Sequence, residues 1–209
     1  MAVFDLFSIG HSNSPIDRFI ALLGEAGVNA VVDVRSTPYS RFCPWFSRNN
    51  LQAHLKSGGI AYLGHGEALG GRPGDTNLYC DGVADYEAMA RTPAFQSGLD
   101  RLQNDMAQHR ISLMCAEREP LDCHRCLLVA RALAARGVAI GHILHDGAIE
   151  PHAVTERRLM QWAESAAEPD LFVTGQNGRL AAAYQRRSRA VGYKAKSGST
   201  GANTVAEQR

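Results

Sequence analysis

Short apolar runs alternate with longer amphipathic stretches through most of this chain. The apolar runs predict five strands, over residues 3–9, 30–34, 60–63, 111–115 and 138–144. The amphipathic stretches predict helices, over residues 15–26, 49–56, 93–109, 123–136 and 152–166. Residues 171–173 are a candidate for a short edge strand. Helices of this length between short strands predict a three-layer α/β fold, a mostly parallel sheet of about five strands with helices on both faces.

Capping residues and prolines predict where two of these helices begin. Ser14-Pro15 and Thr92-Pro93 each combine a residue that caps a helix with a proline, which is favoured at the first helical position. Gly27 predicts the end of the first helix, because glycine readily adopts the backbone conformation that closes a helix.

The length and composition indicate one domain with a tail. The chain has 209 residues, of which 45% are hydrophobic, enough for a core of its own. We expect a single α/β domain over residues 1–175 and a C-terminal extension over residues 176–209. Five basic residues fall within a short stretch of that extension without an acid: Arg186, Arg187, Arg189, Lys194 and Lys196. We therefore expect the extension to be basic, and disordered from about residue 186.

Charge and cysteine content narrow the class of protein. The net charge of +1 gives no overall field that would attract nucleic acid. The first residues lack the pattern of a signal peptide, and no apolar run approaches the roughly 18 residues needed to cross a bilayer. Five cysteines, an odd number, are typical of reduced thiols in a chain with an ample core. We expect a cytoplasmic protein without a membrane partner.

Polar or glycine residues follow every predicted strand. They are Gly10, His11 and Ser12, then Asp33 and Arg35, then Gly64, then Cys115 and Glu117, then His142 and His145. The carboxyl ends of parallel strands lie at one edge of a sheet, where helix N-termini also point their free N–H groups. We therefore expect the functional site at this edge.

Four arginines near this edge are candidates for holding an anion: Arg35, Arg41, Arg72 and Arg125. A guanidinium pairs with phosphate or carboxylate through two parallel hydrogen bonds. The alternative is that each arginine pairs with a neighbouring acid, such as Asp33, Glu67, Glu117 or Asp122. Aromatic residues around the second and third strand ends, Tyr62 among them, would stack on a substrate or fold onto the core.

Glu117, Cys115, Cys123 and His124 are the candidate catalytic residues. A carboxyl group at a strand end suits a general acid or base, and the alternative for Glu117 is a structural pair with Arg125. Cys123 is the best candidate for a thiolate, because a helix N-terminus and neighbouring cations lower the pKa of a thiol. Cys115 ends a buried strand, where a free cysteine is most often a small core residue.

The cysteines are also a candidate metal set, made of Cys115, Cys123, Cys126 and His142. Their Cys-x7-Cys-x2-Cys spacing is not that of a zinc finger. The Cys123-x-x-Cys126 pair at a helix start would instead suit dithiol redox chemistry. We therefore predict no cofactor and keep a metal as the less favoured alternative.

Four motifs occur in order along the chain: Ser8-Ile9-Gly10-His11-Ser12, Asp33-Val34-Arg35-x-x-Pro38-x-Ser40-Arg41, Tyr62-Leu63-Gly64 with Leu69-Gly70-Gly71, and Cys115-Ala116-Glu117 with Cys123-His124-Arg125. Together they resemble domain-of-unknown-function family 488, over residues 7–147. The resemblance implies a bacterial or archaeal cytosolic α/β protein of a family whose activity is not established. It places the shared motif residues at His11, Ser12, Arg35, Ser40, Arg41, Gly70, Gly71, Cys115, Glu117, Cys123, His124 and Arg125.

Cys126 departs from the pattern of that family, where a small residue such as serine is commoner. This departure weakens the dithiol interpretation and any metal site that requires Cys126. The basic segment after Arg186 lies outside the resemblance.

Three functions are open on the sequence. We favour an enzyme, a hydrolase or a transferase, that acts on a phosphate-bearing substrate such as a nucleotide or nucleic acid, with Glu117 and Cys123 for the chemistry. Its substrate-binding residues would be His11, Ser12, Arg35, Ser40, Arg41, Tyr62, Gly70, Gly71 and Arg125. The second function is thiol-dependent sulfur transfer or redox chemistry. The third is a nucleic-acid-binding module without catalysis, whose basic extension holds phosphates.

Overall fold

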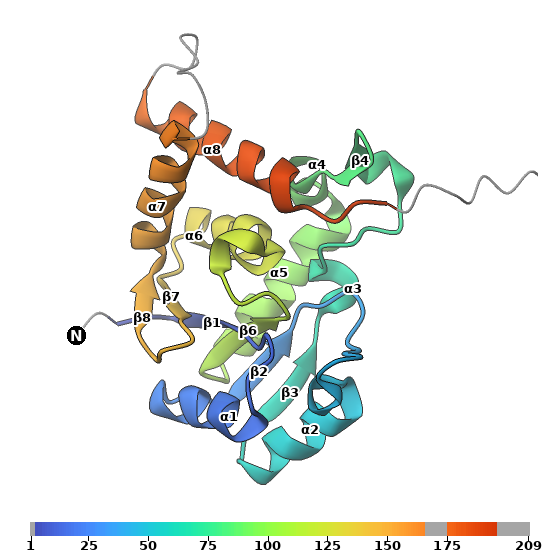
Figure 1. Cartoon of the computed structure of the whole chain (residues 1–209), viewed down its shortest axis with the longest axis vertical. Helices are drawn as coiled ribbons and strands as arrows, with labels where there is room; N and C mark the ends of the chain where they lie inside the picture. Colours follow the sequence, from blue (N-terminus) through green and yellow to red (C-terminus); the bar gives the residue numbers. More distant parts are fainter. Residues whose placement is uncertain (1–2, 166–174, 196–209) are drawn as a thin grey trace, which may run out of the picture.

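A six-stranded sheet lies at the centre of the fold (Figure 1). The computed structural model describes residues 3–165 and 175–195. The strands of this sheet, in their spatial order, are β3 (Ala61–Gly64), β2 (Ala30–Asp33), β6 (Ile111–Cys115), β1 (Leu6–Gly10), β7 (Ile140–Ile143) and β8 (Ile149–Pro151). All neighbouring pairs are parallel except β7 and β8. The predicted α/β fold with a mostly parallel sheet is confirmed. The edge strand β8 is an addition, because its three residues form no apolar run.

Helices cover both faces of the sheet (Figure 1). Val31 of β2 packs into a core with α1 (Ile16–Glu25) and α2 (Arg48–Ser57). Its neighbours on the strand, Ala30 and Val32, point into the opposite core. That core includes side chains of α5 (Pro93–Met106), α6 (Arg131–Ala135), α7 (His152–Ser165) and α8 (Gln176–Val191). β2 is buried at every position, as expected for a strand between two helical layers.

The register of the strands gathers the predicted polar residues at one edge. Gly10 of β1 lies opposite Cys115 of β6. Asp33, the last residue of β2, lies opposite Gly64 of β3 and Met114 of β6. The carboxyl ends of these four strands therefore meet, and the loops that follow them are neighbours.

One of the two predicted helix caps is confirmed. The Oγ1 atom of Thr92 accepts a hydrogen bond from the backbone N–H of Phe95 at 3.2 Å, at the start of α5. In α1, Pro15 and not Ser14 is the last residue before the helix, because Pro15 still has an extended backbone with ψ at 141°. No side chain caps that helix.

The segment after β6 departs from a regular α-helix. Residues Arg125–Ala130 form a π-helical segment (η4), and α6 begins only at Arg131. The predicted helix over residues 123–136 is therefore present, but its first turns are π-helical, which is a wider helix than the α-helix that follows. A π-helical turn shifts the direction of the side chains that follow, and such turns are frequent at functional sites. Every residue of η4 is buried.

Short elements between β3 and α5 form one end of the molecule. They are too short to give a periodic pattern: α3 (Gly66–Leu69), β4 (Tyr79–Cys80), β5 (Val83–Ala84) and α4 (Tyr86–Ala90). The 3₁₀ turn η2 (Thr76–Leu78) lies in the same region, and two further 3₁₀ turns lie elsewhere in the described chain, at η1 (Pro44–Phe46) and η3 (Pro120–Asp122). The chain returns to the β4–β5 hairpin after α8, where the N–H of Ala84 donates to the carbonyl of Tyr193 at 2.9 Å.

The expected disorder from residue 186 is wrong for residues 186–191, because α8 continues to Val191. Ala183 and Tyr184 are each only 2% exposed and hold the helix on the core. Arg187 forms an ion pair with Asp122, which anchors the last turns. The candidate strand at 171–173 and residues 196–209 lie outside the described residues. Within the described part, no helix is long and apolar enough to cross a membrane.

Candidate functional site

A pocket of about 400 Å³ opens at the carboxyl edge of the sheet. Its volume falls in the range of pockets that take small molecules, roughly 300–1,000 Å³. Cys115, Glu117 and His124 line it from β6 and the segment that follows. Other parts of its wall come from distant segments and include Arg35, Arg72, Tyr86 and Tyr193. Four separate stretches of chain therefore meet around one set of reactive side chains.

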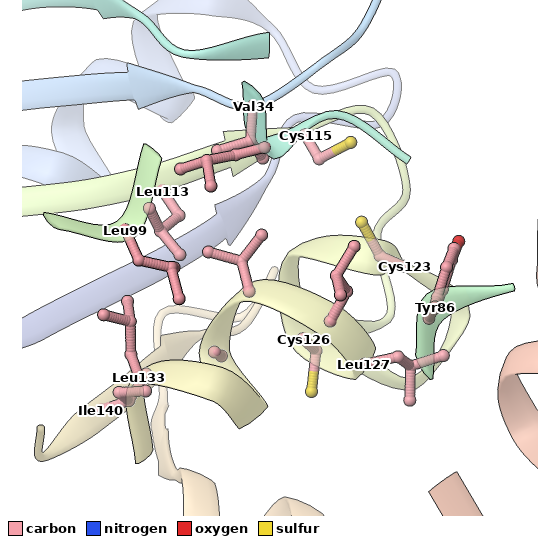
Figure 2. Close-up of a cluster of buried hydrophobic side chains, with 14 of the residues drawn as sticks. Val34, Tyr86, Leu99, Leu113, Cys115, Cys123, Cys126, Leu127, Leu133 and Ile140 are labelled. Atoms are coloured by element: carbon pink, nitrogen blue, oxygen red, sulfur yellow. The ribbon is translucent and has the colours of Figure 1, made fainter. Parts of the chain in front are cut away.

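Two thiols and a carboxyl group meet at this pocket. The Sγ atoms of Cys115 and Cys123 lie 3.0 Å and 3.1 Å from the same oxygen of Glu117, Oε2. Both cysteines are buried, whereas Glu117 is not. In Figure 2 the sulfur atoms of these two cysteines lie near the end of the strand, and the sulfur of Cys126 points away from them. The site therefore contains a pair of thiols and not a set of three.

The two thiols of the pair have opposite pKa shifts. Burial raises the pKa of Cys115 well above its usual value, and the neighbouring Cys123 raises it further. Burial also raises the pKa of Cys123, but a hydrogen bond from Cys115 and the charges of Arg125 and His124 bring it well below the usual value. These opposite shifts favour a proton on Cys115 and a negative charge on Cys123. Burial, and then this charge, raises the pKa of Glu117.

His124 contacts β2 with one ring nitrogen and the thiol pair with the other. Its Nε2 atom lies 2.9 Å from the carbonyl oxygen of Val34, and because a carbonyl only accepts, Nε2 carries a proton. Its Nδ1 atom lies 3.7 Å from Sγ of Cys115 and 3.9 Å from Sγ of Cys123. Burial lowers the pKa of His124, but the charge and hydrogen bond of Cys123, the hydrogen bond to Val34 and the charge of Glu117 together outweigh burial, so the net shift is upward.

Arg125 is fully buried beside the site and is not among the residues that line the pocket. Its guanidinium donates to the carbonyls of Glu117 and Arg118 at 2.6 Å and 3.0 Å, and to Oγ of Ser8 at 3.4 Å. Its backbone N–H donates to Sγ of Cys123 at 3.4 Å. Arg125 therefore holds the loop that carries Glu117 and stabilises negative charge on Cys123.

Arg35 lines the pocket, but Asp33 holds its guanidinium. The two side chains form hydrogen bonds of 2.7 Å and 2.9 Å. The hydroxyl of Tyr62 donates to the same carboxylate at 2.9 Å, and Nε2 of His11 lies 3.2 Å from NH1 of Arg35. Burial lowers the pKa of His11 to about 4 and raises the pKa of Tyr62 to about 12. Asp33, Arg35, Tyr62 and His11 thus form one hydrogen-bonded network at the pocket.

The motif glycines let the loops of the site approach one another. A Cβ atom at Gly71 would lie 2.7 Å from Cγ of His124. At Gly10 it would lie 1.9 Å from the carbonyl oxygen of Glu117, and at Gly70 it would meet the loop after β2 at 2.2 Å. Gly71 lines the pocket, whereas Gly70 and Gly10 are not among its lining residues. Close packing therefore requires these glycines next to the reactive side chains.

Three further candidates, Ser12, Ser40 and Arg41, are not among the residues that line the pocket. The backbone N–H of Ser12 donates to the loop after β6 at 2.9 Å, with φ at +47°. The Oγ atom of Ser40 accepts from the N–H of Cys43 at 3.2 Å. The guanidinium of Arg41 lies over the ring of Phe42, 5.8 Å from its centre. The structure gives these residues local contacts within their loops.

Arg72 is the candidate arginine that lines the pocket without an acid partner among the described residues. Among the described residues no acid pairs with its guanidinium, which lies 4.8 Å from the ring centre of Tyr193. Tyr86 lines the same pocket. Contact with an aromatic ring stabilises a cation without neutralising its charge. This wall therefore offers one positive charge and two phenol rings to a ligand.

The alternative metal set of Cys115, Cys123, Cys126 and His142 does not come together, because Cys126 and His142 belong to a separate buried cluster. Sγ of Cys126 lies 3.9 Å from Nε2 of His142, which lies 2.9 Å from Nδ1 of His152. The structure thus divides the metal-binding side chains into two groups: Cys115, Glu117, Cys123 and His124 at the pocket, and Cys126, His142 and His152 behind it.

Tyr86 and Tyr193 are two of the residues of the pocket wall that the sequence patterns miss. Tyr86 follows Asp85, whose side chain accepts hydrogen bonds from two backbone N–H groups at the start of α4. An aspartate before a short amphipathic stretch is a usable signal for such a helix. Tyr193 has no such signal, because it follows a basic stretch whose composition suggests disorder.

A model of the family described as Domain of unknown function DUF488 matches residues 15–132, more than half of the chain. The matched range includes the thiol pair, Glu117, His124 and Arg125. No curated protein and no solved structure matches the chain.

Proposed function

Because the chain belongs to the DUF488 family, whose description leaves the activity open, we propose its function from the site: an enzyme that acts on an anionic small molecule bound in the pocket. One observation carries this proposal. Arg72, a cation without an acid partner among the described residues, shares a pocket with Cys115, Glu117 and His124. A charge that holds the substrate next to perturbed acid–base groups is the arrangement expected of an active site.

The internal contacts of the other arginines narrow the substrate class. Arg35 and Arg125 already bind protein groups, so they do not join Arg72 in the four-arginine anion site that the sequence suggests. A single guanidinium pairs with one phosphate or carboxylate group. We favour a small phosphate-bearing molecule with a flat part against Tyr86 and Tyr193, such as a nucleotide, over a nucleic-acid strand.

Glu117 is the group that we propose to donate or accept the proton of the reaction. Burial and the neighbouring Cys123 raise its pKa, which brings it closer to neutral pH, where a general acid or base is most effective. It lines the pocket and is not buried, which gives a ligand access to the carboxyl group. The reaction we propose is a hydrolysis or a group transfer, since both require a proton to move at the bond that breaks.

Titration calorimetry with adenosine monophosphate and with inorganic phosphate tests the proposal. We expect Arg72→Ala to weaken binding by about tenfold or more, the loss typical of one charged hydrogen bond. Arg41→Ala is the matched control, because Arg41 is an arginine outside the pocket, and its affinity should equal that of the wild type. Binding that is equal in Arg72→Ala and the wild type, or absent from both, would contradict the proposal.

Thiol-dependent sulfur transfer or redox chemistry is the second candidate, and the shared proton of the Cys115–Cys123 pair favours it. In that case one thiol should alkylate rapidly with iodoacetamide near neutral pH in the wild type and in Cys126→Ser. The rapid phase should be lost in Cys123→Ser. The third candidate function, a nucleic-acid-binding module, has no comparable support. It would need the basic residues of the C-terminal segment to bind phosphates, and one of them, Arg187, is paired with Asp122.

A further inference from the structure

The thiol pair and His124 place three soft donor atoms around one point. Nδ1 of His124 lies 3.7 Å from Sγ of Cys115 and 3.9 Å from Sγ of Cys123. A tetrahedral zinc ion has bonds of about 2.3 Å to sulfur and about 2.0 Å to nitrogen, which separates neighbouring sulfur and nitrogen ligands by about 3.5 Å. Together with Oε2 of Glu117, all four donor atoms lie within 4.8 Å of one another. The spacing therefore suits a shared metal ion with little movement.

A second observation, independent of this spacing, concerns the orientation of the imidazole. The Nε2–H group of His124 donates to the carbonyl of Val34 at 2.9 Å. In metal sites the ligating histidine almost always donates its other ring nitrogen to a carbonyl or carboxylate, which fixes the ring. In the ring without a proton on Nδ1, the lone pair of that nitrogen faces the two sulfur atoms. The backbone N–H of Arg125 also donates to Sγ of Cys123 at 3.4 Å, which supports a thiolate.

We propose that Cys115, Cys123 and His124 bind a divalent transition-metal ion of the zinc type at the pocket. Two thiolates and an imidazole suit zinc, whereas magnesium and calcium prefer oxygen ligands. Binding displaces the proton of the Cys115 thiol, and a proton on Nδ1 of His124, into solvent. Three protein ligands with a fourth position open to a pocket are typical of catalytic zinc.

This inference deepens the proposed function and rests on it only for the catalytic role of the metal. Of the four side chains in this group, only Glu117 is not buried. It would therefore stand next to the open fourth ligand position of a bound zinc ion. A thiolate that binds a metal is no longer a free nucleophile, so the inference also separates the proposed enzyme from the thiol-dependent alternative.

The cluster of Cys126, His142 and His152 does not compete for this role. Nε2 of His142 and Nδ1 of His152 are hydrogen-bonded to each other at 2.9 Å. Their other ring nitrogens contact Oγ of Ser8 at 2.7 Å and the hydroxyl of Tyr184 at 3.1 Å. Every ring nitrogen therefore has a partner within a buried chain. Cys126, which is as buried as Cys123, provides a matched control.

Metal content of the full chain, purified without chelators or added metal, is the first measurement. We expect about one zinc ion per chain by mass spectrometry. Metal-free protein should take up zinc in competition with a chromophoric chelator. Cys115→Ser, Cys123→Ser and His124→Gln should each weaken zinc binding by at least about 100-fold, and Cys126→Ser should leave it unchanged. Equal losses in Cys126→Ser, or wild-type protein that takes up no zinc, would overturn the proposal.

A measurement on the wild type alone covers the case in which a variant does not fold. Zinc should slow the alkylation of Cys115 and Cys123, read by peptide mass spectrometry, and leave Cys80 unaffected; all five cysteines are free thiols. Unchanged alkylation of the pair would refute the site. If zinc binds to wild type and Arg72→Ala alike while neither binds nucleotide or phosphate, the metal site stands and the proposed substrate class falls.

Discussion

The role of an arginine at this site depends on its surroundings, as a comparison of Arg35, Arg72 and Arg125 shows. Asp33 neutralises Arg35, two backbone carbonyls hold Arg125, and a tyrosine ring supports Arg72 at the pocket. The sequence indicates that arginines gather near the strand ends. It does not indicate which of them keeps its charge available, because that depends on partners far away along the chain. The reactive residues were easier to predict, since Cys115, Glu117, Cys123 and His124 lie within a single stretch.

Replacement of Arg125 by lysine tests its structural task. Lysine cannot reach both carbonyls with the planar geometry of a guanidinium. We expect Arg125→Lys to lower the free energy of unfolding by about 2–4 kcal/mol, because buried carbonyls lose their donors. Urea denaturation measures this value. Arg41→Lys, outside the pocket, should change it by less than about 0.5 kcal/mol, and similar values for the two variants would disprove the structural role.

Gly71→Ala tests the contact between the glycine loop and His124. The added Cβ atom would lie 2.7 Å from Cγ of the imidazole, so the ring must move away from its hydrogen bond to Val34. We expect zinc affinity to fall by about tenfold or more, as for loss of a group that orients a ligand. Gly74→Ala is the control, since its Cβ atom would meet nothing within 4 Å. Equal affinities in both variants would exclude this effect.

At the scale of elements, the long periodic segments could be predicted and the short ones could not. The five parallel strands and the helices α1, α2, α5 and α7 have clear apolar patterns. The pattern fails for β8, α3 and α4, which have five residues or fewer. It also fails for α8, where the buried Ala183 and Tyr184 are followed by a basic stretch whose composition suggests disorder. Tertiary contacts, and not local sequence, hold these elements.

Two truncations test the contribution of α8. Deletion of residues 176–209 should lower the free energy of unfolding by at least about 3 kcal/mol, because the core loses Tyr184 and its neighbours. Deletion of residues 196–209 alone should leave stability and zinc binding unchanged. Thermal unfolding monitored by circular dichroism compares the two. If the longer deletion were as stable as the wild type, α8 would contribute nothing to the core.

At the scale of the whole molecule, buried histidines link stability to pH. Burial lowers the pKa of His11 to about 4, and it lowers the pKa of His142 and His152 as well. These rings stay neutral in the folded protein, whereas they take up protons near pH 6.5 in the unfolded chain. The unfolded state therefore binds more protons in this window, and stability falls as the pH drops below about 6.5.

His142→Gln should reduce this acid sensitivity. One histidine with a lowered pKa contributes up to about 1.4 kcal/mol per pH unit below its unfolded value. His152, Arg125 and Arg158 also disfavour a proton on His142, after burial. Urea denaturation between about pH 7.5 and pH 5 should therefore give a shallower slope for the variant than for the wild type. Identical slopes would show that His142 takes up a proton equally well in the folded protein.

The position of Tyr193 in the pocket wall has a consequence for how such proteins diversify. The reactive side chains all lie within the residues that the family model matches, whereas Tyr193 follows a helix well beyond that range. Mutations in α8 and the residues that follow it can therefore reshape the pocket while the residues of the proposed chemistry stay unchanged. We expect that exchange of α8 and the residues that follow it between related chains would transfer ligand preference. This segment would then be a part of the protein that can be replaced on its own.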